Sequence, residues 1–153
     1  MTGWRIGYTA GDRNVIKAMG KLQGQSTSCP TSISQMAAIE ALTGDQSEVG
    51  RMRKEFKKRR DYIVGRLTNM EGVSCAIPGG AFYVFHDFSK YMDKGGKIAC
   101  SRDLSMYLLE KKSVATVSGD AFGGEGHIRF SYAASEDDIR RAMDSVEETL
   151  NEV

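Results

Sequence analysis

The end of the chain carries the feature that most restricts its fold, a stripe of apolar residues at helical spacing. The stripe recurs at i, i+3, i+4, i+7, i+11 and i+14 and consists of Ile139, Ala142, Met143, Val146, Leu150 and Val153. Ser135 and Asp138 precede the stripe with the spacing of a capping box, which marks the start of a helix. We therefore predict an amphipathic helix that begins near Ser135 and buries one side against a core.

The rest of the chain alternates between strand and helix patterns. Strands are predicted over residues 4–10, 73–77, 81–85, 114–117 and 127–133, and helices over residues 13–22, 32–42, 45–70 and 101–110. Asp12 and Ser101 are the predicted caps of two of these helices. Segment 81–85 is almost continuously apolar and aromatic, so we expect it to be a central strand. The helix over residues 45–70 would be roughly 37 Å long, which suits a connector between two lobes.

This order of elements is typical of one fold class. A strand and helices are followed by a strand pair, a helix, two strands and the closing helix. That order predicts an α+β fold, in which a small mixed or antiparallel sheet has its helices on one side, and not a repeating βαβ fold.

Composition narrows the classes of partner. The chain has 153 residues, enough for one domain or for one domain and part of another. Its 21 basic and 20 acidic residues nearly balance, which gives no reason to expect a nucleic acid or an anionic membrane as a partner. No apolar run approaches the roughly 20 residues that span a bilayer, and the first residues do not have the pattern of a signal peptide.

The cysteines and histidines indicate neither disulfides nor a metal. Cys29, Cys75 and Cys100 are few, odd in number and widely spaced, which predicts reduced thiols in a cytoplasmic protein. His86 and His127 lack the spacing of a metal-ligand pair, so we expect no metal site.

Four segments together indicate a family. They are Gly3-Trp4-Arg5-Ile6-Gly7, Pro30-Thr31-Ser32-Ile33-Ser34-Gln35, Pro78-Gly79-Gly80-Ala81-Phe82-Tyr83, and Gly119-Asp120-Ala121-Phe122-Gly123 followed by Ile128-Arg129-Phe130-Ser131-Tyr132-Ala133. In this order, and over nearly the whole chain, they resemble the C-terminal part of class I/II aminotransferases. These are fold-type-I enzymes that use pyridoxal 5'-phosphate (PLP), and the resemblance is strongest to prokaryotic-type aspartate aminotransferases.

The resemblance implies a division of the chain. Residues 1–44 would be a remnant of the large PLP-binding domain, and residues 45–153 would be the C-terminal small domain with its long connecting helix. The intact protein would exchange an amino group between an amino acid such as aspartate and a 2-oxoacid, and it would be a homodimer. Because residues 1–25 would pack in the large domain, we expect them to be disordered here or to pair with another copy.

For the cofactor, the resemblance assigns a phosphate site to the start of the chain. Arg5 would bind the PLP phosphate through its planar fork of donors, and Gly3 would allow close approach of the backbone. One hydroxyl of Ser26 or Thr27 would help to bind the phosphate of the neighbouring subunit. Two alternatives stay open: Arg5 could pair with a surface carboxylate, and the two hydroxyls could cap the next helix.

For the substrate, the resemblance assigns two residues in the second half of the chain. Arg129 would bind the α-carboxylate, because the strand pattern directs it away from the face of Ile128 and Phe130. Gly80 would border the substrate pocket in a turn that moves on closure. The alternatives are an arginine that covers apolar surface on an edge strand and an ordinary hairpin turn. Phe122 is expected to belong to the core.

The family's central catalytic residue has no counterpart in these residues. The Schiff-base lysine lies about eight residues before the arginine that Arg5 matches, so it would fall upstream of residue 1. We expect no catalytic residue in the chain and no activity from it alone. The alternatives are a natural non-catalytic binding or dimerisation module, and a fragment of a related PLP lyase or synthase.

Overall fold

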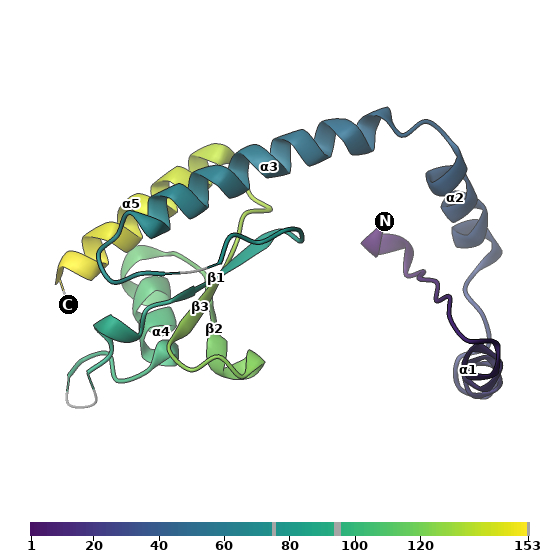
Figure 1. The fold of residues 1–153 in the computed structure, drawn as a ribbon, viewed down its shortest axis with the longest axis horizontal. Helices are drawn as coiled ribbons and strands as arrows, with labels where there is room; N and C mark the ends of the chain where they lie inside the picture. The colour runs from purple at the N-terminus through teal and green to yellow at the C-terminus, as the bar shows by residue number, and fades with distance from the viewer. Residues whose placement is uncertain (75, 94–95, 153) are drawn as a thin grey trace. The chain divides into compact units, whose positions relative to one another are not determined.

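The computed structural model describes residues 1–74, 76–93 and 96–152. It consists of two compact units, Met1–Gly50 and Arg51–Val153. The division falls inside helix α3 (Ser47–Thr68), later in the chain than the predicted division after residue 44 (Figure 1). No helix in the described ranges is long and apolar enough to cross a membrane.

The first unit contains a 3-10 turn, η1 (Thr2–Trp4), and helices α1 (Arg13–Ser26) and α2 (Ser32–Thr43). Side chains just before the two α-helices cap them, as is usual for aspartate and threonine. The Asp12 carboxylate accepts the backbone N–H of Asn14 at 2.9 Å, and the Thr31 hydroxyl accepts that of Ser34 at 3.2 Å. The helices predicted over residues 13–22 and 32–42 are thus present, and both run slightly further.

The strand predicted over residues 4–10 is wrong. Residues 5–12 lie in no helix or strand, and Arg5 has a left-handed backbone with φ of 51°. A strand needs a neighbouring strand to satisfy its backbone groups, and within the described residues no ladder includes this segment. The alternating pattern alone therefore does not make a strand.

The second unit is built on a three-stranded antiparallel sheet with the order β1-β3-β2. The strands are β1 (Tyr83–Asp87), β2 (Val117–Ser118) and β3 (His127–Ser131). In the register, Phe85 and Val117 both lie opposite Arg129. The strand predicted over residues 81–85 is present as β1, but its predicted central position is wrong. Strand β3 pairs on both sides, and β1 lies at one edge of this sheet.

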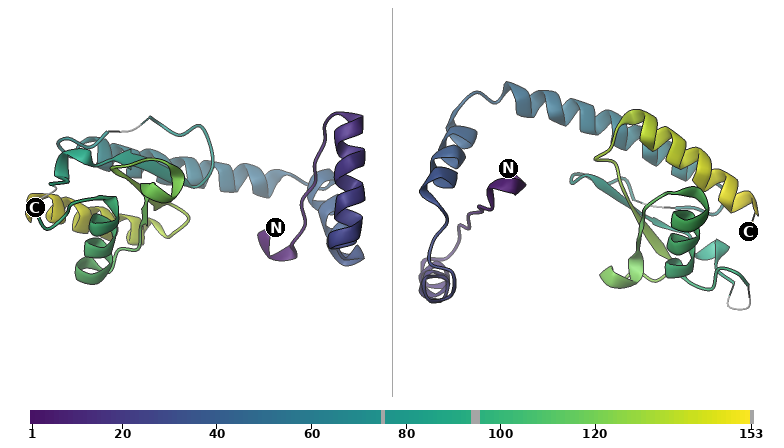
Figure 2. Two further views of the ribbon diagram at one scale, coloured as in Figure 1. Left: turned by 90° about the horizontal axis from the view of Figure 1, so that it is seen from below. Right: turned by 180° about the vertical axis from the view of Figure 1, so that it is seen from behind.

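Helices cover one face of the sheet (Figures 1 and 2). Helix α3, α4 (Ser101–Lys112) and α5 (Glu136–Glu152) pack against the strand side chains that alternate inward. One buried core joins these elements and includes Leu67, Val84, Leu104, Leu108, Ile128, Phe130, Ile139, Met143 and Val146. This arrangement matches the predicted α+β class with its helices on one side.

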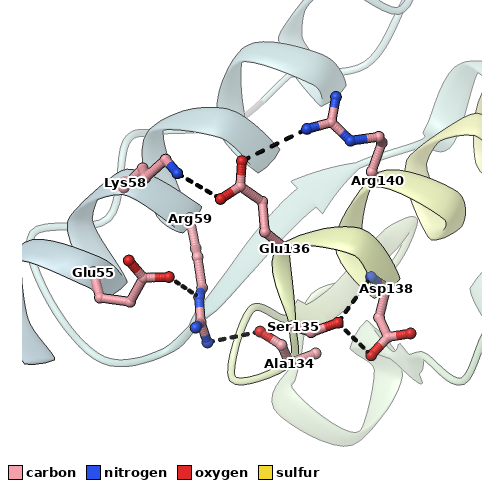
Figure 3. Close-up of polar contacts among 8 residues, drawn as sticks. All are labelled: Glu55, Lys58, Arg59, Ala134, Ser135, Glu136, Asp138 and Arg140. Atoms are coloured by element: carbon pink, nitrogen blue, oxygen red, sulfur yellow. Dashed lines mark hydrogen bonds and ion pairs between the residues drawn. The ribbon is translucent and has the colours of Figure 1, made fainter.

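One group of polar contacts between α3 and α5 lies at the start of α5 (Figure 3). Lys58 Nζ pairs with Glu136 Oε2 at 2.6 Å, and Arg59 donates to the carbonyl oxygen of Ala134 at 2.7 Å. The Ser135 hydroxyl accepts the backbone N–H of Asp138 at 3.1 Å, which forms the predicted serine cap. The hydroxyl also lowers the pKa of the Asp138 carboxyl by donating to it. Two helices far apart in the sequence are therefore joined side by side.

Two predicted strands and one predicted helix cap differ from those in the structure. The strand over residues 73–77 is represented by one isolated bridge, Ser74 to Asp87, and Cys75 lies outside the described residues. The strand over residues 114–117 is shorter and later, as β2. Cys100, not Ser101, precedes helix α4. The backbone N–H of Cys100 donates to the Asp103 carboxylate at 3.2 Å. Short β segments depend on distant partners, so their bounds are hard to place from local pattern.

Candidate functional site

Arg129 lies on the face of the sheet opposite the buried core. Along β3, the side chains of Ile128 and Phe130 are buried, whereas Arg129 between them is half-buried. The period-two alternation of a strand places Arg129 on the other face, with Phe85 of β1 and Val117 of β2. Arg129 therefore belongs to a central strand, and it is not the edge-strand arginine that the alternative interpretation required.

Two aromatic rings surround the Arg129 guanidinium. Its Cζ lies 4.5 Å from the ring centroid of Phe122 and 5.2 Å from that of Tyr83. Among the described residues, the Arg129 side chain makes no ion pair and no hydrogen bond. A guanidinium over an aromatic face is attracted by the ring quadrupole while its N–H groups stay unused. This cation is thus available to bind an anion.

The sequence did not indicate these two rings as functional. Phe122 was expected in the core, but 52% of it is exposed, because it lies on the 3-10 turn η3 (Gly119–Phe122) at the open face. Tyr83 is also exposed, at the start of β1. Both come from segments distant from Arg129 in the chain, and hydrophobicity does not distinguish a ring over a cation from a core ring.

The turn that precedes β1 is held by two side chains. Arg60 on α3 donates to the carbonyl oxygen of Pro78 at 3.1 Å, and the Tyr132 hydroxyl donates to that of Ala81 at 2.9 Å. Ala81 has φ of 64°, a left-handed conformation that costs energy for a residue with a Cβ atom. Gly80, the predicted pocket residue, belongs to this turn, and a Cβ there would meet no described atom within 4 Å. The turn continues directly into β1, whose first residue, Tyr83, contacts the Arg129 guanidinium with its ring.

Arg5 lies in the first unit, at the end of η1. It lines a hollow of about 660 Å³ together with Thr9, Thr27 and Pro30. Arg5 Nη1 donates to the carbonyl oxygen of Thr2 at 3.3 Å, and within the described part of the chain the guanidinium is in no ion pair. The alternative of a surface carboxylate partner therefore finds no support among these residues.

The other residues predicted to bind the cofactor do not all lie in the hollow of Arg5. Thr27 lines the hollow of Arg5, and its hydroxyl oxygen accepts a hydrogen bond from Gln23. Ser26 instead donates to the carbonyl oxygen of Leu22 at 2.9 Å, inside the last turn of α1. Neither residue caps the next helix, because Thr31 does so. A Cβ at Gly3 would meet no described atom within 4 Å.

The histidines are not arranged as a metal site. His86 is fully buried on β1, and burial, followed by the nearby charge of His127, lowers its pKa to about 4. His127 stacks on the Phe85 ring with centroids 4.8 Å apart. Over the described ranges, no cluster of three or more histidine, cysteine or acidic side chains could hold a metal ion. Cys29 and Cys100 are free thiols.

Comparisons with known proteins and structures all identify aminotransferases. Residues 1–146 match the family model for aminotransferase class I and II. The chain is 46% identical to an aspartate aminotransferase of Pinus pinaster over 98% of its length, and 47% identical to an aspartate/prephenate aminotransferase of Cereibacter sphaeroides over 93%. Its structure resembles the crystal structure of the aspartate aminotransferase of Rhizobium meliloti, with a TM-score of 0.87 and 42% identity over 99% of this chain.

The matched proteins are much longer than this chain. It covers 32% of the pine protein, 36% of the Cereibacter protein and 39% of the Rhizobium structure. The chain therefore spans about a third of the length of the relatives that it matches.

Proposed function

The chain belongs to the class I and II aminotransferases, and on that basis we propose that it is the C-terminal part of an amino-acid aminotransferase. Residues 1–44 would come from its large domain and residues 45–153 would form its small domain. In this proposal Arg5 binds the cofactor phosphate and Arg129 binds the substrate α-carboxylate. The observation that carries the proposal is a half-buried Arg129 with no anionic partner among the described residues.

Enzymes of this family depend on pyridoxal 5'-phosphate, and the donors of the first unit suit its phosphate group. The Arg5 guanidinium has a single hydrogen bond, to a carbonyl oxygen, so most of its N–H groups can donate to phosphate oxygens. Thr27 uses its hydroxyl oxygen as an acceptor, which leaves its O–H free to donate. Arg5 lines an open hollow, which supports it as a ligand of this subunit's phosphate, and Thr27 keeps a donor for the phosphate of the neighbouring subunit. For Ser26 and Gly3, the role stays a prediction without a supporting contact.

The chemistry of the reaction explains why Arg129 matters. The cofactor, when bound, acts as a sink for the electron pair that is left when a bond at the substrate Cα breaks. Arg129 can bind the α-carboxylate with two parallel N–H donors, which fixes the direction of the Cα–H bond. The rings of Tyr83 and Phe122 exclude water from part of the guanidinium and so strengthen this charge pairing.

We propose an amino acid and a 2-oxoacid as substrates, with aspartate as the first candidate. Relatives at 42–47% identity are named aspartate or aspartate/prephenate aminotransferases, which supports this class. We further propose that the intact protein is a cytoplasmic homodimer. The free thiols of Cys29 and Cys100 are consistent with a reducing compartment.

We also propose that these 153 residues are inactive by themselves. The lysine that carries the cofactor in this family would precede residue 1, and Lys17 and Lys21 lie on helix α1, outside any such motif. Without that lysine the chain keeps a phosphate site and a carboxylate site but lacks the group that moves the proton.

Titration of the chain with PLP, followed by borohydride reduction and peptide mass mapping, tests this proposal. We expect no lysine to be labelled stoichiometrically, and no oxaloacetate from aspartate and 2-oxoglutarate. Weak binding of PLP should persist and should be lost in Arg5→Ala. Arg13→Ala, a substitution of a neighbouring arginine outside the hollow, is the matched control and should bind as the wild type does. A single saturated lysine with turnover would refute the proposed inactivity, and equal PLP binding in Arg5→Ala would refute the phosphate site.

A further inference from the structure

We propose that Phe122, together with Tyr83, is a positioning residue for Arg129. The two rings hold the guanidinium in one place and leave its N–H groups available for a carboxylate. This inference rests on the proposed role of Arg129, which it deepens by naming what orients the arginine.

The first argument concerns what surrounds the guanidinium. Long arginine side chains need partners to be ordered, and most obtain them from carboxylates or carbonyl oxygens. Among the described residues, the contacts of the Arg129 guanidinium are both aromatic, at 4.5 Å to Phe122 and 5.2 Å to Tyr83. A side-chain carboxylate would occupy the same donors that a substrate needs, whereas a ring face does not. Aromatic contacts can thus order this arginine without competing with its ligand.

The second argument is that the turn that carries Phe122 is itself held in place. Phe122 is the last residue of the turn η3, and the carboxylate of Asp120 in this turn accepts two hydroxyl donors. Ser101 donates to Oδ1 at 2.9 Å and Ser118 donates to Oδ2 at 3.0 Å. Ser101 is fully buried and is the first residue of helix α4. The turn that carries Phe122 is therefore tied to the start of a core helix.

The third argument is the close contact between this turn and the beginning of β3. The backbone N–H of Gly124 donates to the carbonyl oxygen of Gly119 at 3.0 Å. A Cβ on Gly119 would lie 2.2 Å from the carbonyl oxygen of Gly124 and 2.6 Å from that of His127, so no side chain fits. Because His127 begins β3, the turn is fixed against the strand that carries Arg129. The turn that carries the ring and the strand that carries the guanidinium are thus in direct contact.

The inference is tested by NMR on the 153-residue chain labelled with 15N-arginine. Arg129→Lys assigns the Nε–H signal of Arg129, since lysine lacks this group. The heteronuclear NOE of this signal measures the order of the guanidinium, and its shift during titration with succinate measures carboxylate binding. In Phe122→Leu we expect a lower NOE and weaker succinate binding, by about two- to fivefold, as for loss of an exposed cation–π contact.

Two variants serve as controls. Phe122→Tyr keeps an aromatic face and should retain the wild-type NOE and succinate affinity. Tyr107→Leu removes a ring on helix α4 whose hydroxyl contacts Glu152 and which, among the described residues, has no ring contact with Phe122, Tyr83 or Arg129, so it should change neither readout. If Phe122→Leu does not fold, Tyr83→Leu removes the other ring and should lower both readouts in the same direction.

The outcomes distinguish the positioning role of the two rings from the proposed carboxylate-binding role of Arg129. A succinate response in the wild type that Phe122→Leu leaves unchanged, with an unchanged NOE, would overturn the positioning inference alone. No succinate response at Arg129 in the wild type would overturn the proposed carboxylate role instead. A lower NOE with lower affinity in Phe122→Leu, and recovery of both in Phe122→Tyr, is the result expected if the rings orient the arginine.

Discussion

Among single residues, His86 shows a clear electrostatic consequence of burial. It is fully buried on β1 opposite Ile128, and neither imidazole nitrogen has a hydrogen-bond partner in the described part of the chain. Burial, and then the charge of His127, lowers the His86 pKa from 6.5 to about 4. The folded protein therefore keeps this ring neutral at pH 7, because a charged ring would lose its solvation there.

We expect acid to destabilise the fold through His86 between about pH 6.5 and pH 4. In this range the unfolded chain binds a proton that the folded chain does not, so the free energy of unfolding falls as the pH falls. The total loss is up to about 3 kcal/mol. Urea unfolding at pH values across this range measures it, and His86→Leu should lose this part of the pH dependence. Equal pH dependence in the two proteins would contradict the assignment.

At the scale of elements, the contact between α3 and the start of α5 combines a half-buried arginine with exposed ion pairs (Figure 3). The Arg59 side chain is 22% exposed, pairs with Glu55 at 2.8 Å and donates to the carbonyl oxygen of Ala134. Its guanidinium also lies 5.7 Å from the ring centroid of Phe56. By contrast, the Lys58 side chain in the neighbouring pair is 64% exposed. Arg59 therefore contributes more to the contact than the exposed pair does.

Arg59→Ala is expected to lower the free energy of unfolding by about 1–2 kcal/mol, because it removes a charged donor from the Ala134 carbonyl and a contact with Phe56. Lys58→Ala is the matched control, and we expect little change, since solvent screens its pair with Glu136. Urea unfolding of the two variants distinguishes them. A larger loss in Lys58→Ala than in Arg59→Ala would show that this ranking is wrong.

The serine cap of α5 allows a second prediction at this scale. Ser135→Ala removes the acceptor for the backbone N–H of Asp138 and should cost about 1 kcal/mol of stability. It should also raise the pKa of Asp138, because the Ser135 hydroxyl is the main group that lowers it. Thermal unfolding and NMR titration of the carboxyl measure the two effects. Ser135→Asp keeps an acceptor and should retain most of the stability; loss as large as in alanine would count against capping.

At the scale of the whole molecule, the two units differ in how much apolar surface they bury. The buried hydrophobic side chains of the described residues all lie between Ile63 and Leu150, in the second unit. In the first unit, Ser34 is the buried residue, and apolar side chains of α1 and α2 such as Leu22, Ile33 and Leu42 are exposed. Since apolar burial is the main source of stability, the first unit has little stability of its own.

We therefore expect backbone amides of α1 and α2 to exchange with deuterium much faster than those of α4 and α5. Hydrogen exchange with mass spectrometry measures the difference, and sedimentation gives the oligomeric state of the same sample. Strong protection of α1 in a dimer would mean that residues of the first unit pair with another copy. Strong protection of α1 in a monomer would refute this account of the first unit.

Local patterns of the sequence determined the helices, because helices are held by contacts within a few residues. The stripe over residues 139–150 became the buried side of α5, with Ser135 as its cap, and Asp12 caps α1 as predicted. The α+β class followed from the order of these elements. The alternation along β3 also placed Arg129 on the face away from Ile128 and Phe130. Each of these features depends on spacing along one segment.

Only the tertiary structure decided which strands exist and what surrounds Arg129. The alternating segment at residues 4–10 has no partner and is not a strand, whereas β3 pairs on both sides and becomes central. The rings of Tyr83 and Phe122 reach Arg129 from separate segments, and the buried Ser101 ties the turn of Phe122 to α4. Strand pairing and ring contacts join residues that are distant in the chain. Their energies depend on the assembled fold, so local spacing could not reveal them.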